Sequence, residues 1–256
     1  MNRIDLAARS PASLPLHDLM CQARGIFLDW DGCVAIGNRV EPGATRLIAR
    51  HADRVAILSN NSTHLPEEFA AILHSAGLSI PPERIVLAGV EAVRAAVARR
   101  PRRVLMFGSP RIRGFAYHEG LHLVREDPDL ILLMRDTRFT FAKLERAANA
   151  LHRGVPLLVA NADRTHPGTD GRIVPETGAL LAALAACAPA AAVTIVGKPG
   201  PTLFARACAV LGIARQDAVM IGDNAETDIR GAEDFGMRSL LIGGAGGVTL
   251  DALAGG

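Results

Sequence analysis

The sequence predicts an α/β protein in which a core built on a parallel sheet is interrupted by an inserted second domain. Short apolar runs alternate with longer helical patterns along the chain, which is typical of strand–helix–strand units. Most of the apolar runs are continuous, as expected for strands that are covered on both faces. The length of 256 residues corresponds to one large domain or two ordinary ones.

The apolar runs that we expect to form strands lie at residues 25–28, 55–58, 85–87, 104–107, 130–134, 156–159, 192–196, 218–221 and 239–242. Helices are expected between them at residues 66–74, 91–100, 141–152 and 201–211. A glycine or proline closely follows each of these four helical segments, where continuing a helix is costly.

Polar residues gather at the ends of the first three and the last three predicted strands, whereas the middle of the chain carries strands and helices with fewer of them. We therefore expect a discontinuous core made of residues 1–87 plus 190–256, with an inserted domain at residues 88–189. No low-complexity linker marks either boundary.

The composition excludes several classes of protein. The 28 Lys and Arg residues and 26 Asp and Glu residues leave a net charge of +2 with no dominant basic tract, which argues against nucleic-acid binding. No apolar run approaches 18 residues, so we expect no membrane span. The first 20 residues lack a signal-peptide pattern, and the four cysteines show no C-x-x-C spacing. We expect a cytoplasmic protein with reduced thiols.

The first polar cluster contains two carboxylates, Asp29 and Asp31, directly after an apolar run and before Gly32. In open α/β sheets, ligands bind beyond the carboxyl ends of the strands. One carboxylate can serve as a nucleophile and the other as a general acid and base, with a divalent cation relieving their repulsion. The alternative is a solvated turn, because Asp and Gly both favour turns.

The second and third clusters bring a hydroxyl, an amide and an ammonium group to other strand ends. Ser59 and Asn60 can hold a phosphoryl oxygen together with the backbone N–H groups that follow them. Lys198, one of only two lysines, suits neutralisation of a transferring phosphoryl group. The alternatives are a helix N-cap formed by Ser62 or Thr63, and a surface lysine in a turn.

The fourth cluster contains Asp223 at the end of an apolar run and Asp228 five residues later. Hard oxygen ligands at this place suit Mg²⁺, which binds one or two carboxylates together with phosphate and water. The alternative is a turn followed by a helix that runs to Phe235, with Thr227 or Asp228 as its cap.

In this order, the four clusters resemble the haloacid dehalogenase superfamily of phosphotransferases, in its NagD-type branch with a class II type A cap between the second and third motifs. The resemblance covers nearly the whole chain from about Gly25. It also rests on Glu41-Pro42-Gly43-Ala44, Asn60-Asn61-Ser62-Thr63, Asp136 within RDTRFTF, Asn161-x-Asp163, Gly178-Ala179 and Thr227-Asp228-Ile229. It implies a Rossmann-like parallel-sheet core with an inserted α/β cap domain.

The resemblance implies a chemical role for the first three clusters. Asp29 would attack phosphorus and form an aspartyl-phosphate, and Asp31 would protonate the leaving oxygen and then activate the hydrolytic water. Ser59 and Lys198 would bind the phosphoryl oxygens, with Asn60 nearby as a main-chain donor. In physical terms this is phosphoryl transfer by positioning and charge neutralisation.

The resemblance also implies a metal site. Mg²⁺ would be held by Asp29, the Asp31 carbonyl and Asp223, with Asp228 ligating it or orienting its ligands. Within the superfamily, the presence of Asp31 favours a phosphatase over a dehalogenase, because a halide leaves without a proton. A phosphonatase would use an imine-forming lysine in its cap, and we expect Lys143 to be an ordinary surface residue.

The resemblance places substrate selection in the cap. Asp163 lies in a stretch that resembles the substrate-specificity loop of the family, and we expect it to bind substrate. Arg164, His166 and Arg172 either meet an anionic or polar leaving group or belong to a solvated loop. Because NagD-type relatives often pair through their caps, a homodimer formed in this way is a further expectation.

The expected function is that of a Mg²⁺-dependent phosphatase acting on small organic phosphate monoesters, in the class of nucleoside monophosphates, sugar phosphates, pyridoxal phosphate or phosphoglycolate. The alternative is a phosphorylation-controlled binding or regulatory protein that uses the same acidic pocket without turnover. Response-regulator receivers combine similar residues, but they are much shorter and their acidic pair precedes the phosphorylated residue. We therefore favour the enzyme.

Overall fold

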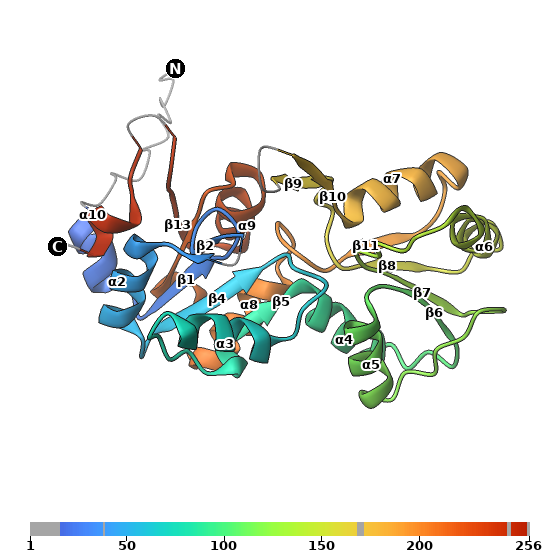
Figure 1. Cartoon of the computed structure of the whole chain (residues 1–256), viewed down its shortest axis with the longest axis horizontal. Helices are drawn as coiled ribbons and strands as arrows, with labels where there is room; N and C mark the ends of the chain where they lie inside the picture. Colours follow the sequence, from blue (N-terminus) through green and yellow to red (C-terminus); the bar gives the residue numbers. More distant parts are fainter. Residues whose placement is uncertain (1–15, 38, 168–171, 245–246, 255–256) are drawn as a thin grey trace, which may run out of the picture.

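The protein contains two parallel sheets that lie next to each other along the long axis of the molecule (Figure 1). The computed structural model describes residues 16–37, 39–167, 172–244 and 247–254. One apolar cluster includes side chains from both sheets, such as Phe27 of the first and Met106 and Leu132 of the second, so a single core joins them. The predicted α/β class with a parallel-sheet core is confirmed.

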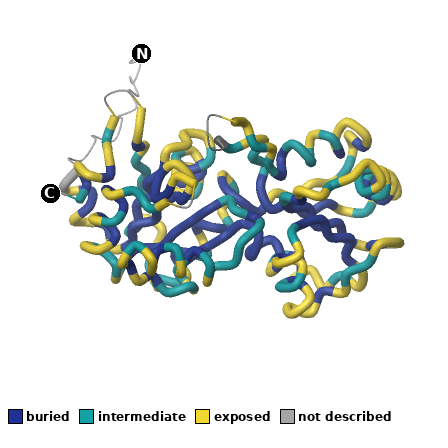
Figure 2. The backbone as a smooth tube through the Cα atoms, in the orientation of Figure 1, coloured by how far each residue is buried: buried dark blue, intermediate teal, exposed yellow. Residues whose placement is uncertain are grey.

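The first sheet has five parallel strands in the order β13-β12-β1-β4-β5. Its strands are β1 (Gly25–Asp29), β4 (Val55–Ser59), β5 (Ile85–Leu87), β12 (Ala218–Gly222) and β13 (Arg238–Leu241). All residues of β1, β4 and β12 are buried, as Figure 2 shows for the centre of this half of the molecule. This complete burial is the physical reason for their continuous apolar sequences.

Helices and short turns surround the first sheet. They are α1 (Leu16–Gln22), α2 (Pro42–His51), α3 (Pro66–Ser75), α8 (Thr202–Leu211), α9 (Arg230–Phe235), α10 (Leu250–Ala254), the 3₁₀ turns η1 (Pro82–Arg84) and η3 (Arg215–Asp217), and the π-helical turn η4 (Ala225–Ile229). A small hairpin, β2 (Ala35–Ile36) with β3 (Arg39–Val40), follows β1. Helix α8 ends at Gly212, whose φ of 64° is left-handed and suits glycine, as the sequence predicts.

The second sheet has four parallel strands in the order β11-β8-β7-β6. They are β6 (Val104–Phe107), β7 (Leu130–Leu133), β8 (Leu157–Val159) and β11 (Val193–Ile195), with helices α4 (Ala88–Ala98), α5 (Pro110–His118), α6 (Phe141–His152) and α7 (Thr177–Cys187). Helices α4 and α5 pack on the face that joins the common core, and α6 and α7 pack on the opposite face in a separate apolar cluster (Figure 1).

Several elements were not expected from the sequence, among them helices α2, α5 and α7. Three further differences concern the inserted part. Strand β11 pairs with β8 in the second sheet rather than joining the first sheet. Helix α4 begins at Ala88, directly after β5, and not at Glu91. The expected loop near Asp163 is followed by an antiparallel hairpin of β9 (Thr165–Pro167) and β10 (Ile173–Pro175). Among the described helices, none is both long enough and apolar enough to cross a membrane.

Candidate active site

The carboxyl ends of β1, β4 and β12 meet at one edge of the first sheet. Asp29 and Ser59 are the last residues of β1 and β4, and Asp223 directly follows β12. A cavity of about 660 Å³ lies over this edge and is lined by these three residues together with Asp31, Asn60, Asp163, Lys198 and Asp228. The structure therefore brings all the site residues expected from the sequence into one cavity.

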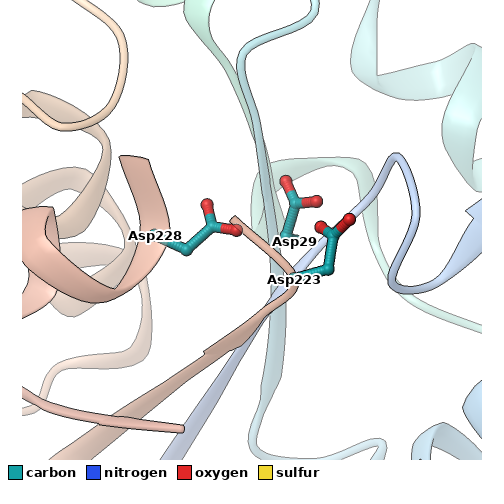
Figure 3. A group of neighbouring side chains, drawn as sticks. All are labelled: Asp29, Asp223 and Asp228. Carbon is teal, nitrogen blue, oxygen red and sulfur yellow. The ribbon is translucent and has the colours of Figure 1, made fainter. Parts of the chain in front are cut away.

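Three carboxylates form a compact group at the base of this cavity. One oxygen from each of Asp29, Asp223 and Asp228 can be chosen so that all three lie within 4.8 Å of one another. Figure 3 shows the three side chains directed toward a common region, from β1, from the loop after β12 and from η4. Carboxylate oxygens at this spacing fit a hard divalent cation such as Mg²⁺.

Gly32 makes room for this acidic group. Its φ of +86° lies in the left-handed region, and a Cβ atom added to it would come 2.3 Å from Oδ2 of Asp223. The Asp31 carboxylate is not part of the three-carboxylate group. The sequence expectation for Asp31 concerned its main-chain carbonyl as a metal ligand, and this stays a prediction.

Lys198 is buried between two of the carboxylates. Its Nζ donates hydrogen bonds to Asp29 Oδ1 at 2.5 Å, to Asp228 Oδ1 at 2.6 Å and to the carbonyl oxygen of Leu58 at 3.1 Å. Only 2% of the lysine is exposed, so the alternative of a surface lysine in a turn is wrong. All three donors of the ammonium group are used, which fixes its position at the end of β1.

The charges of this group are strongly interdependent. Burial by itself lowers the pKa of Lys198, but the carboxylates of Asp228 and Asp29 outweigh it and hold that pKa above its ordinary value. Burial raises the pKa of Asp29 well above its ordinary range, Lys198 opposes this shift, and Asp228 adds to it. Lys198 is therefore a permanent cation that offsets part of the negative charge concentrated here.

Asp31 projects from the loop after β1 into the cavity. Burial raises the pKa of its carboxyl, while the positive charges of His166 and Lys198 act in the opposite direction. A carboxyl group with a raised pKa is better suited to donating a proton than an ordinary aspartate is. The raised pKa does not separate Asp31 from Asp29, whose pKa is raised as well; the two differ because only Asp29 is paired with the buried ammonium group.

Asp228 is held in place by the backbone of the turn that carries it. It is fully buried, and its Oδ2 accepts a hydrogen bond from the N–H of Asn224 at 3.1 Å. The cap of this turn is Asn224, whose Oδ1 accepts from the N–H groups of Glu226 and Thr227, and not Thr227 or Asp228 as the alternative reading expected. The Asp228 carboxylate is therefore held by the Asn224 N–H on one side and by Lys198 on the other.

Asn60 holds the backbone on both sides of Lys198. Its Oδ1 accepts from the Lys198 N–H at 2.8 Å, and its Nδ2 donates to the Lys198 carbonyl at 3.1 Å and to Asp163 Oδ1 at 3.3 Å. The expectation from the sequence concerned the Asn60 main chain, whereas the structure gives its side chain a positioning role. Ser59 is buried, and its Oγ accepts a hydrogen bond from the Asn61 N–H.

The alternative of a helix cap at Ser62 or Thr63 is also wrong. Helix α3 is preceded by Leu65, whose N–H donates to Glu68 Oε2 at 2.8 Å. Ser62 is instead buried against the inserted part, where its Oγ lies 3.3 Å from Oγ1 of Thr177 and accepts a hydrogen bond from the Arg135 N–H. This serine therefore ties the loop after β4 to the inserted part.

The cavity is also lined by side chains that the sequence analysis did not single out or left open. Glu176 Oε1 lies 2.7 Å from His166 Nδ1 and 3.3 Å from Arg135 Nε, and His64 lines the same cavity. Arg164 and Arg172 also line the cavity. Arg135 could have been identified from the sequence, because it directly follows the predicted strand at 130–134. No sequence pattern pointed to Glu176 or His64 as residues of the site.

Lys143 differs from its expected role as an ordinary surface residue. Its Nζ donates to Asp136 Oδ2 at 2.7 Å and to the Arg138 carbonyl at 2.9 Å, and its side chain is 32% exposed. Because Asp136 is buried, the lysine neutralises a carboxylate that is otherwise shielded from water. This pair does not line the candidate active-site cavity.

Comparisons with known proteins agree with this arrangement. A family model for haloacid dehalogenase-like hydrolases matches residues 26–122, and a HAD-hydrolase-like model matches residues 195–253. Chronophin of Rattus norvegicus is 32% identical over 242 residues, which cover 88% of this chain and 78% of chronophin. Dihydroxyacetone phosphatase of Corynebacterium glutamicum is 28% identical over 218 residues, which cover 84% of this chain and 78% of that protein.

Solved structures show the same likeness. The structure of glycerol phosphate phosphatase from Mycobacterium tuberculosis in complex with magnesium matches with a TM-score of 0.79 at 28% identity, covering 90% of this chain and 71% of the other. The similarity to chronophin extends over most of both sequences. The chain therefore belongs to the haloacid dehalogenase-like hydrolases, and it is a phosphatase of their NagD-type branch.

Proposed function

We propose that this phosphatase hydrolyses small organic phosphate monoesters in a Mg²⁺-dependent reaction that passes through an aspartyl-phosphate on Asp29. The observation that carries the proposal is a cluster of charges in one cavity: Lys198 bridges Asp29 and Asp228, and one oxygen of each of these carboxylates lies within 4.8 Å of an oxygen of Asp223. Such a site can hold a phosphoryl group against a nucleophile only when fixed positive charge offsets the carboxylates.

Asp29 and Asp31 divide the chemistry between them. A carboxylate oxygen of Asp29 attacks phosphorus, and the bond to the ester oxygen breaks while Asp31 gives that oxygen its proton. Asp31 then takes a proton from a water molecule, which attacks phosphorus, releases inorganic phosphate and restores Asp29. Lys198 keeps Asp29 oriented, and Ser59 at the end of β4 offers its hydroxyl to the phosphoryl oxygens.

Asp29, Asp223 and Asp228 are the residues that would hold Mg²⁺. When bound, the ion supplies positive charge that stabilises the phosphoryl oxygens as charge builds up on them. The relative named glycerol phosphate phosphatase has been solved in complex with magnesium and with calcium, which supports a divalent cation as the cofactor of this protein.

Side chains of the inserted part line the cavity where the substrate would bind, and they support small organic esters as substrates. Asp163 reaches the cavity and is held by Asn60, and burial raises the pKa of its carboxyl. Arg164, His166 and Arg172 face the same cavity and suit a polar or anionic leaving group. The relatives named dihydroxyacetone phosphatase and sugar-phosphatase support small organic esters as substrates.

We also propose that the chain divides into a discontinuous core and an inserted cap. The sequence boundary at 190 falls just before β11, which is a strand of the second sheet. A cap extending from residue 88 to about residue 196 therefore keeps that sheet whole. Pairing of two caps in a homodimer and a cytoplasmic location stay predictions.

The experiment is phosphate release from nucleotide, sugar, glycolate, glycerol and pyridoxal phosphates, with Mg²⁺ or with chelator. We expect release that needs Mg²⁺ and is lost in Asp29→Asn. Asp31→Asn should impair alkyl phosphates more than 4-nitrophenyl phosphate, because a nitrophenolate leaves without a proton. Folded, Mg²⁺-loaded protein that releases phosphate from none of these esters would overturn the proposal.

Acid quenching separates the enzyme from the regulatory alternative. After mixing with a labelled phosphate donor, the enzyme should carry label on Asp29 only while substrate lasts, and Asp31→Asn should carry more label because its hydrolytic step is slow. A stable label in the wild-type protein with no released phosphate would instead indicate a phosphorylation-controlled binding protein.

A further inference from the structure

A second cavity, of about 410 Å³, lies in the inserted part at the carboxyl ends of β6 and β7. None of the residues that line it lines the candidate active-site cavity. A volume of this size falls in the range of small-molecule sites, which is about 300–1,000 Å³. The cavity has no part in the hydrolysis described above.

The topology of the second sheet creates this crevice. Strands β6 and β7 are parallel neighbours. After β6 the chain enters α5, whose Ile112 packs on the face of the common core, and after β7 it enters α6, whose Ala147 packs on the opposite face (Figure 1). Ligands of open α/β sheets bind where the connections from two neighbouring strands diverge in this way.

The lining of the crevice is strongly cationic. It contains the five basic side chains of Arg113, Arg125, Arg138, Lys143 and Arg146, but only one carboxylate, that of Asp136. Five positive charges and one negative charge leave a net charge of +4. Such a concentration of like charge in one cavity is unfavourable unless an anion offsets it.

Three of the basic side chains already have partners within the protein. Lys143 is paired with Asp136, Arg146 Nε lies 3.1 Å from an oxygen of Glu126, and Arg113 donates to the carbonyl of Met106. The side chains of Arg125 and Arg138 have no hydrogen bond or ion pair with any residue that the structure describes. Two guanidinium groups are thus available to a ligand.

We propose that the crevice between β6 and β7 is a binding site for a small organic anion that carries a phosphate group. Guanidinium groups bind phosphate through paired N–H donors, and Arg125 and Arg138 supply two such groups at the rim of one cavity. The crevice holds no free carboxylate or thiol in its lining, so it is a binding site rather than a second reaction centre.

Two consecutive residues line the crevice and the candidate active site. Arg135 lines the active-site cavity, and Asp136, the next residue, lines the crevice. Arg135 is bound to Glu176, whereas Asp136 is bound to Lys143. A ligand that draws Lys143 away from Asp136 would therefore act on the segment that positions Arg135.

The test uses inorganic pyrophosphate as the probe, in chelator so that no turnover occurs. Binding is measured by calorimetry and located by amide hydrogen exchange. We expect protection of residues 106–113 and 136–146 in the wild type. The double variant Arg125→Gln/Arg138→Gln should bind at least about tenfold more weakly there, because each lost charged hydrogen bond costs about one order of magnitude.

Matched controls make the outcome decisive. The double variant Arg99→Gln/Arg102→Gln removes the same two charges from exposed positions of the inserted part outside the crevice and should bind like the wild type. Succinate has the charge of a small dianion without a phosphate group and should bind more weakly than pyrophosphate. Equal affinity of the Arg125→Gln/Arg138→Gln variant and the wild type, absence of protection at the two segments, or equal affinity for succinate would each overturn the proposal. Hydrolysis by the Arg125→Gln/Arg138→Gln variant, assayed separately, should be unchanged.

Discussion

The ammonium group of Lys198 lies 2.6 Å from Oδ1 of Asp228, and both side chains are almost completely removed from water. The lysine belongs to the loop after β11, whereas Asp228 belongs to η4, so the pair links the second sheet to the acidic edge of the first. Because the same ammonium group also holds Asp29, it is the electrostatic centre of the site.

Replacing Lys198 by methionine should lower both activity and stability. The change leaves Asp29 and Asp228 as neighbouring buried carboxylates without a counter-charge, and we expect the free energy of unfolding to fall by about 3–5 kcal/mol. Arg24→Met is the control, because Arg24 and its partner Asp217 are both accessible to water and the pair should contribute about 1 kcal/mol or less. Urea unfolding in chelator measures both, and equal losses would contradict the assignment.

Gly32→Ala should weaken the metal site. An added Cβ would collide with the Asp223 carboxylate, so we expect the Mg²⁺ concentration for half-maximal activity to rise at least about tenfold. Gly37→Ala is the control, because Gly37 also has a positive φ but open space around it. Both variants should lose about 1–2 kcal/mol of stability from the left-handed backbone. An identical Mg²⁺ dependence in the two would argue against a metal at Asp223.

Asn60→Asp should reduce kcat while preserving the fold. The variant loses the two hydrogen bonds that Nδ2 donates and places a second carboxylate beside Asp163, which displaces the Lys198 backbone. A misplaced catalytic group can cost on the order of 100-fold in rate. Asn61→Asp adds the same charge one residue later and keeps the bonds accepted by Oδ1 from Thr63 and His64. Steady-state kinetics should show the larger loss at Asn60.

His64 should make the stability depend on pH. Burial, with Arg111, lowers the pKa of His64 below its ordinary value of 6.5. As the pH falls, the unfolded chain therefore takes up this proton first, and stability that is present above about pH 6.5 is lost on acidification. The fall in unfolding free energy between about pH 7.5 and about pH 5.5 should be smaller in His64→Gln, whereas the exposed control His118→Gln should match the wild type.

Removal of Mg²⁺ should lower the melting temperature. A ligand that binds only the folded state at about 100 times its Kd stabilises it by about 2.7 kcal/mol. Scanning calorimetry with increasing Mg²⁺ should show a rising Tm in the wild type and almost none in Asp223→Asn, which loses one of the three grouped carboxylates. A rise of the same size in both would place the ion elsewhere.

Local sequence patterns were sufficient for the strands of the two parallel sheets and for the acidic ends of two of them, but not for the two small hairpins. Burial on both faces makes β1, β4 and β12 continuous apolar runs, and the first polar residue after each run marks the edge where ligands bind. Asp29, Ser59 and Asp223 could therefore be chosen without coordinates. Their roles in the proposed reaction came from the family resemblance and await the experiments above.

Only the tertiary structure shows which distant segments of the chain contact each other. Asp29 and Lys198 are 169 residues apart, and the sequence contains no pattern that pairs them. Three other features depend likewise on how the two sheets pack. They are the pairing of β11 with β8, the hydrogen bond from the Lys198 N–H to Asn60, and the ion pair of Arg135 with Glu176. Hydrophobic periodicity is local and specifies where strands begin and end. The neighbours of each polar side chain are set by packing over the whole molecule, which no local pattern encodes.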